Sequence, residues 1–110
     1  MTVNNILADI NRATASTEEQ TDTLLNHPAF ELERIVSRGT TTPEGEWYDQ
    51  ERDEWVLVVL GRATLTFDDA GPLQLNPGDY VHIPARCRHR VEWTDPQSET
   101  VWLALHYSGR

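Results

Sequence analysis

The sequence contains no lysine, so arginine alone supplies its nine cationic side chains. Eighteen aspartates and glutamates outnumber them, and the formal net charge is -9. An acidic surface of this kind repels phosphate backbones and anionic lipid headgroups at long range. The charge balance therefore argues against nucleic acid and membranes as partners.

Cysteine and long apolar runs are also scarce. The one cysteine, Cys87, has no second cysteine in the chain with which to form a disulfide, which suits a reducing compartment. No stretch approaches the roughly 18 consecutive apolar residues of a membrane span. The first ten residues lack the basic start and apolar run of a secretion signal. We therefore expect a cytoplasmic protein.

Residues 1–29 are predicted to form a short helical arm ahead of the main domain. Thr17, followed three positions later by Gln20, has the spacing of a helix capping box, and Leu24 and Leu25 follow it within the next five residues. A second short helix is predicted within the first dozen residues, where a few apolar side chains would pack inward.

Residues 30–110 are predicted to form an all-β domain. Short apolar or alternating runs are divided by turn signals such as "DDAGP" and "NPGD", and no later segment keeps a helical period. In "ATLTF", for example, Ala63, Leu65 and Phe67 share one face of a strand. At least seven short strands at close spacing are typical of a sandwich or barrel.

Two segments of this domain resemble the paired motifs of the cupin superfamily. Glu54, six residues and Gly61 match the second half of the first motif, and Gly78, Pro84 and His89 match the spacing of the second. The stretches "EWVLVVLG", "GDYVHIPA" and "WLALHY" are similar to those of small bacterial single-domain cupins. The resemblance implies a double-stranded β-helix, or jelly-roll, barrel.

The chain departs from the family pattern at three positions. The two histidines of the first motif are missing, and their places hold Tyr48 and Gln50, or Trp47 and Asp49, depending on the length of the gap before Glu54. The glycine expected between Pro84 and His89 is Arg86.

The resemblance implies a divalent metal ion inside the barrel, held by Glu54 and His89. One imidazole and one carboxylate suit iron, manganese, nickel or zinc, but two ligands are few. Gln50 or Asp49 is a candidate third ligand, and so is His106 if it faces inward on the last strand.

Strand alternation separates the crowded stretch "RCRHR", residues 86–90, into two faces. If His89 points inward, it does so together with Val91 and Trp93, while Arg88, Arg90 and Glu92 point outward. Cys87 between two arginines would have a lowered pKa if exposed, although a turn-filling role is the alternative. Arg86, at the barrel rim, is either a surface residue or a clamp for a substrate carboxylate.

We therefore expect a metal-binding cupin that acts on or binds a small organic molecule inside its barrel. Tyr48 and His106 are the candidates for moving a proton, and Gln50, Arg86 and Trp102 for contacting the substrate. The alternative is a ligand-binding or accessory module without metal, in which Glu54 and His89 form a hydrogen-bonded pair. Exposed sheet edges favour a homodimer.

Overall fold

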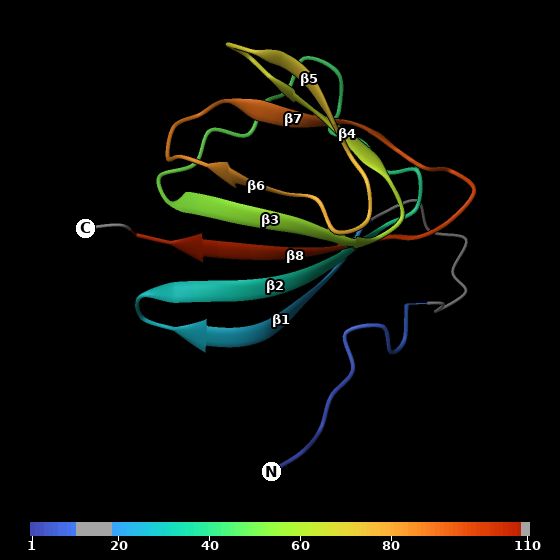
Figure 1. Ribbon diagram of the computed structural model, residues 1–110. Helices are drawn as coiled ribbons and strands as arrows, with labels where there is room; N and C mark the ends of the chain where they lie inside the picture. The colour runs from blue at the N-terminus through green and yellow to red at the C-terminus, as the bar shows by residue number, and fades with distance from the viewer. Residues whose placement is uncertain (11–18, 109–110) are drawn as a thin grey trace.

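The computed structural model describes residues 1–10 and 19–108. Within these residues, eight strands form two sheets, and Figure 1 shows that the sheets face each other. The five-stranded sheet has the order β1-β2-β8-β3-β6, and the three-stranded sheet has the order β5-β4-β7. All paired strands are antiparallel, which confirms the predicted all-β jelly-roll class. The strands are β1 Gln20–His27, β2 Phe30–Ser37, β3 Asp53–Leu60, β4 Ala63–Phe67, β5 Gly71–Leu75, β6 Tyr80–Ile83, β7 His89–Thr94 and β8 Thr100–Tyr107.

The hydrophobic core lies between the two sheets and follows the alternation of the strands. Val56 and Val58 of β3 face Ala63 and Leu65 of β4, all nearly inaccessible to solvent. In an antiparallel strand, residues two apart share a face. The same inward face of β3 therefore begins with Glu54, and that of β8 ends with His106, so the core turns polar at one end of the barrel.

The helix predicted around Leu24 and Leu25 is wrong, because residues 20–27 form strand β1. β1 pairs with β2 along its length, from Gln20 against Val36 to His27 against Phe30. The pairing provides hydrogen-bond partners for backbone N–H and C=O groups of β1. An isolated short helix, by contrast, is only marginally stable in water. Thr17 lies outside the described residues. Residues 6–10, where the other helix was expected, form turns.

Strand β7 contains a register shift that changes the predicted faces. Val91 pairs with Leu65 and Trp93 pairs with Thr64, so one extra residue, Glu92, lies between two consecutive partners of β4. A bulge of this kind reverses the alternation beyond it. His89 and Val91 thus face the barrel as predicted, whereas Trp93 is 37% exposed and points away from it.

The two arginines on either side of His89 have different surroundings. Arg88 is exposed and pairs with Asp68, as expected for an outward residue. Arg90 pairs with Glu92 at 3.5 Å, and its guanidinium also donates to the carbonyl of Thr42 at 2.9 Å. Arg90 therefore holds the loop that leads to Tyr48 against the outer face of β7.

The edges of the larger sheet are formed by β1 and β6. Leu24 and Leu25 on β1 are both exposed. The expected homodimer stays a prediction. Among the described residues there is no helix long and apolar enough to cross a membrane.

Candidate functional site

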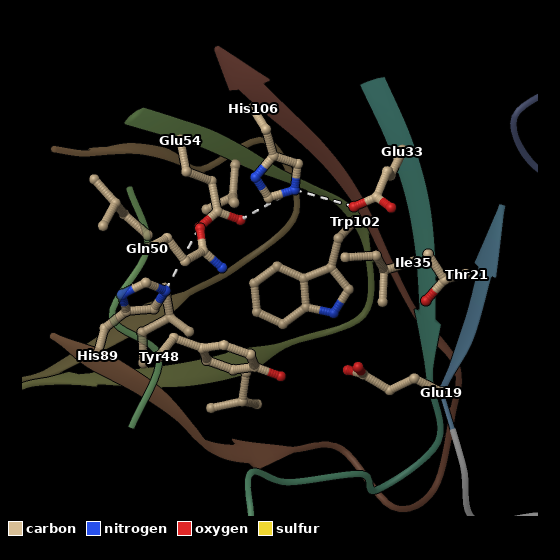
Figure 2. A pocket seen from close by; sticks show the side chains of 14 residues that line it. Glu19, Thr21, Glu33, Ile35, Tyr48, Gln50, Glu54, His89, Trp102 and His106 are labelled. Carbon is tan, nitrogen blue, oxygen red and sulfur yellow. Dashed lines mark hydrogen bonds and ion pairs between the residues drawn. The ribbon is translucent and has the colours of Figure 1, made fainter. Parts of the chain in front are cut away.

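A pocket of about 270 Å³ opens at the polar end of the core, between the two sheets. Figure 2 shows side chains from both sheets and from the loop before β3 converging on it. Its lining is formed by Glu19, Thr21, Glu33, Ile35, Tyr48, Gln50, Glu54, Val56, Leu65, Ile83, His89, Val91, Trp102 and His106.

Carboxylates and imidazoles alternate along one wall of the pocket. Glu54 Oε1 lies 3.5 Å from His89 Nε2, and Glu54 Oε2 lies 4.0 Å from His106 Nε2. The His106 Nε2 atom is also 3.0 Å from Glu33 Oε1. Strand pairing explains the arrangement, because β8 is hydrogen-bonded to both β2 and β3, with His106 directly opposite Glu54.

Glu54 is the least satisfied polar group of this wall. It is 7% exposed, and among the described residues its Oε1 atom has no hydrogen-bond partner. The separation of 3.5 Å from His89 is that of an ion pair at the outer limit of hydrogen bonding. A buried acceptor without a donor is costly, so this oxygen is available to a group that enters the pocket.

The environment of His89 favours its charged form. Burial lowers the pKa of His89, but the contact with the Glu54 carboxylate and a hydrogen bond with the Cys87 carbonyl outweigh it, and the pKa is raised from its usual value. His89 Nδ1 lies 2.9 Å from that carbonyl, which can only accept, so Nδ1 donates. The Nε2 atom is thereby left facing Glu54.

The opposite end of the pocket is organised by a second hydrogen-bonded chain. The indole Nε1 of Trp102 donates to the hydroxyl of Ser37 at 3.2 Å, and that hydroxyl donates to Glu19 Oε2 at 2.9 Å. Ser37 is fully buried. Burial raises the pKa of Glu19, and the Ser37 hydrogen bond opposes the shift in part. Burial and the charge of Glu19 also raise the pKa of Tyr48.

We expect Glu19→Gln to stabilise the empty protein at pH 7 and to leave its stability unchanged at pH 4. A carboxyl whose pKa is raised by folding contributes stability below its unfolded pKa and loses it as the pH rises through the folded value. Glutamine stays neutral and keeps an oxygen for Ser37. The gain should be under about 1 kcal/mol because the carboxyl is partly exposed. Thermal unfolding of both proteins at both pH values measures it, and an equal change at pH 4 and pH 7 would contradict it.

Several predicted site residues do line the pocket. Tyr48, Gln50 and Glu54 share it, as expected for residues separated by even numbers of positions in extended chain, and Figure 2 shows them with His89. The backbone of Tyr48 is hydrogen-bonded to that of His89 in both directions. Their rings are stacked with centroids 5.5 Å apart. Trp102 and His106 face inward on β8.

Asp49 and Arg86 lie outside this lining. The Arg86 guanidinium is exposed and pairs with Asp49 and Glu51, each at 3.3 Å. Its backbone has a φ of 65°, in the left-handed region that glycine occupies readily, which explains why the related pattern has glycine there. The roles of Asp49 as a ligand and Arg86 as a substrate clamp stay predictions without support from this geometry.

Cys87 is not activated by its two arginine neighbours. Arg88 pairs with Asp68 and Arg86 with Asp49, so both guanidinium charges are engaged elsewhere. Desolvation, followed by the charge of Asp69, raises the pKa of the Cys87 thiol. The exposure that a lowered pKa would require is not met, because Cys87 is half-buried, and the turn-filling role fits.

Sequence reasoning missed Glu19, Thr21 and Glu33. Glu19 and Thr21 lie in the segment whose sequence pattern favours a helix, so no strand alternation pointed to them. Glu33 is two residues from Ile35 in "FELERIVS", and both line the pocket. Alternation in that strand was the available signal, but it does not say which face of β2 points inward.

The residues present fit a metal ion only in part. Glu54 Oε1 and His89 Nε2 are two donors of suitable chemistry, and the hydrogen bond at His89 Nδ1 orients the ring in the way that metal-bound histidines usually are. Within residues 1–10 and 19–108, however, no three histidine, cysteine, aspartate or glutamate side chains are arranged to hold an ion.

Comparison with known proteins agrees with this architecture. The family model described as "Cupin domain" matches residues 35–106. A crystal structure from Ralstonia eutropha JMP134, named a "putative mannose-6-phosphate isomerase", is 42% identical, covers 99% of this chain and all of its own, and superposes with a TM-score of 0.91. No match was found among curated proteins.

More distant structures share the fold alone. A Cupin 2 conserved barrel domain protein from Salinispora arenicola is 22% identical over 99% of this chain and 90% of its own, with a TM-score of 0.70. A cupin superfamily protein from Desulfitobacterium hafniense is 18% identical over 87% of this chain and 83% of its own, with a TM-score of 0.71.

Proposed function

Because the chain belongs to the family of cupin domains, we propose that its barrel binds a small organic molecule and that Glu54 is the group that engages it. The observation that carries the proposal is the buried Oε1 atom of Glu54, which lacks a hydrogen-bond donor among the described residues and faces the pocket. An O–H or N–H group of a ligand would supply that donor. The fold by itself names no ligand.

The neighbours of Glu54 would allow proton transfer to or from such a ligand. His89 lies on one side of the carboxylate, with its Nε2 atom 3.5 Å from Oε1. His106 lies on the other side, with its Nε2 atom 4.0 Å from Oε2 and hydrogen-bonded to Glu33. Imidazoles hold and release protons near neutral pH, and a carboxylate between them can pass a proton in either direction. Tyr48, stacked on His89, adds a hydroxyl group to the lining.

The Oε1 atom of Glu54 would also suit a divalent metal ion, which is the second candidate ligand of the pocket. Glu54 and His89 would hold it, with His106 as a third ligand only if its contact with Glu33 were given up. Such an ion would supply Lewis-acid polarisation of a bound oxygen. The proposed binding of an organic molecule does not require it.

A sugar phosphate is a poor fit to this pocket, whatever the Ralstonia protein accepts. Proteins bind phosphate groups with arginine, lysine or backbone N–H clusters. Within residues 1–10 and 19–108, the lining contains three glutamates and no arginine, and the chain has no lysine. We therefore do not propose a sugar phosphate as the ligand of this barrel.

The proposal is tested by native mass spectrometry and metal analysis of untagged protein, with Glu54→Gln and His89→Gln as variants. We expect a bound small molecule, or binding of one from a metabolite library, that Glu54→Gln weakens about 10- to 100-fold through loss of a charged hydrogen bond. The matched control is Glu44→Gln, an exposed glutamate outside the pocket, which should leave binding unchanged.

The outcomes separate the two occupants. Near-stoichiometric metal that both Glu54→Gln and His89→Gln abolish would establish the metal-bound form. Ligand binding that persists at full strength in Glu54→Gln, or a library without any binder, would overturn the proposal.

A further inference from the structure

The charges of the pocket are unbalanced in favour of carboxylates. Among the described residues its lining holds three glutamates and two histidines, so even with both imidazoles protonated their formal charge is 2 - 3 = -1. His89 and His106 face Glu54 and Glu33. The third carboxylate, Glu19, has the neutral hydroxyl of Ser37 as its hydrogen-bond partner.

The arginines of the described chain are engaged elsewhere. Arg34 and Arg38 bind backbone carbonyls of the N-terminal turn, and Arg90 binds the loop before Tyr48. The other described arginines, Arg52, Arg62, Arg86 and Arg88, pair with carboxylates outside the pocket lining. Among the described residues, no arginine therefore compensates Glu19.

Glu19 is held in place by buried groups. Ser37 donates to it and in turn accepts from the indole of Trp102, which is 4% exposed. Figure 2 shows the Glu19 carboxylate and the Tyr48 hydroxyl directed toward each other, with the Trp102 indole beside them. A fixed carboxylate next to two aromatic rings is the combination that stabilises organic cations, by ion pairing and by cation–π attraction.

The cost of this arrangement in the empty protein also points to a ligand. Burial makes the ionised form of Glu19 unfavourable, and Glu54 keeps a buried oxygen without a hydrogen-bond donor among the described residues. One ligand with a cationic group at the Glu19 end and an O–H or N–H donor at the Glu54 end would relieve both.

We propose that the ligand of this pocket is a small organic cation, an amine or quaternary ammonium compound, whose charged group lies between Glu19 and the rings of Tyr48 and Trp102. This inference rests on the proposed function and names the chemical class of its ligand. At about 270 Å³ the pocket is at the small end of the range for ligand sites, which suits a compact head group with a short polar tail.

The test compares three probes by calorimetric titration of the full chain at pH 7 and low salt. Choline is the cation, 3,3-dimethylbutan-1-ol has the same shape without the charge, and mannose 6-phosphate is the anion. We expect choline to bind, the neutral isostere to bind at least about tenfold more weakly, and the phosphate to give no heat of binding.

Two variants make the result specific to Glu19. Glu19→Gln should remove the preference for choline over its isostere, and it should fold because the substitution removes an unfavourable buried charge. Glu44→Gln, which is exposed and outside the lining, should retain the preference.

Each contrary outcome overturns the cationic class. These outcomes are absence of choline binding, equal binding of the isostere, tighter binding of the phosphate, or a preference that survives Glu19→Gln. A neutral probe that binds in a Glu54-dependent manner would leave the proposed function standing while this inference fails. If Glu54→Gln left binding unchanged while the preference for choline remained, this inference would stand and the proposed role of Glu54 would fail.

Discussion

Replacing Gly61 with alanine is expected to lower the free energy of unfolding by about 2–5 kcal/mol. Gly61 joins β3 to β4 with a φ of 83°, and a Cβ there would lie 2.6 Å from the Glu99 carbonyl oxygen and 2.6 Å from Thr100 Cα. The left-handed backbone costs a side chain about 1–2 kcal/mol. The clash with backbone atoms adds a further cost of about 1–3 kcal/mol, as overpacking does.

A matched glycine separates the two causes. Gly71 has a φ of 82°, but a Cβ there meets nothing within 4 Å. Gly71→Ala should therefore cost only the conformational part, about 1–2 kcal/mol. Urea unfolding of the two variants and the parent chain measures the difference. Equal costs at the two positions would show that close approach to Thr100 is not what requires glycine at Gly61.

Replacing Arg34 with methionine should be the second large destabilisation, about 2–4 kcal/mol. The Arg34 side chain is buried, its Nη2 atom lies 2.7 Å from Asp22 Oδ2, and its Nη1 atom donates to the carbonyl of Ile6 at 3.0 Å and to that of Ala8. Removing one partner of a buried pair leaves the other desolvated. Breaking a fully buried ion pair costs about 3–5 kcal/mol. We expect a smaller cost for Arg34→Met because Asp22 is partly exposed.

The N-terminal turn provides a separate readout of Arg34. Since its guanidinium binds two carbonyls of residues 6–8, its loss should speed proteolysis near that turn more than it speeds proteolysis elsewhere. Arg52→Met is the matched control, because Arg52 and Glu31 form an exposed pair at 3.2 Å that should contribute less than about 1 kcal/mol. If Arg34→Met is no more destabilising than Arg52→Met, the guanidinium does not hold the turn.

The fold was readable from the chain because its signals are local. Turn sequences such as "NPGD" separate apolar runs, and the spacing of Glu54, Gly61, Pro84 and His89 matches a known family. The N-terminal helix was the main error in the fold. The capping-box pattern at Thr17 and Gln20 is local too, but strand pairing of β1 with β2 prevailed over it.

The candidate site was readable only in part. In extended chain, Tyr48, Gln50 and Glu54 fall on one face because even numbers of residues separate them. The structure brings them together in one pocket. The same alternation gave the wrong face for Trp93, because the extra residue Glu92 in β7 reverses the faces beyond Val91. A bulge depends on the partner strand and leaves no mark in a two-residue period.

The strands after residue 30, the barrel class and the inward placement of Glu54 and His89 follow from local patterns and motif spacing. The groups that surround these two side chains could not be predicted in that way, because they come from distant parts of the chain. Glu33 and His106 are separated by 73 positions in the chain but meet because β8 pairs with both β2 and β3. Glu19 reaches the pocket through β1 and Ser37. A side-chain period reports which residues share a face, whereas the order of strands in a sheet decides which faces meet, and that order follows from long-range pairing.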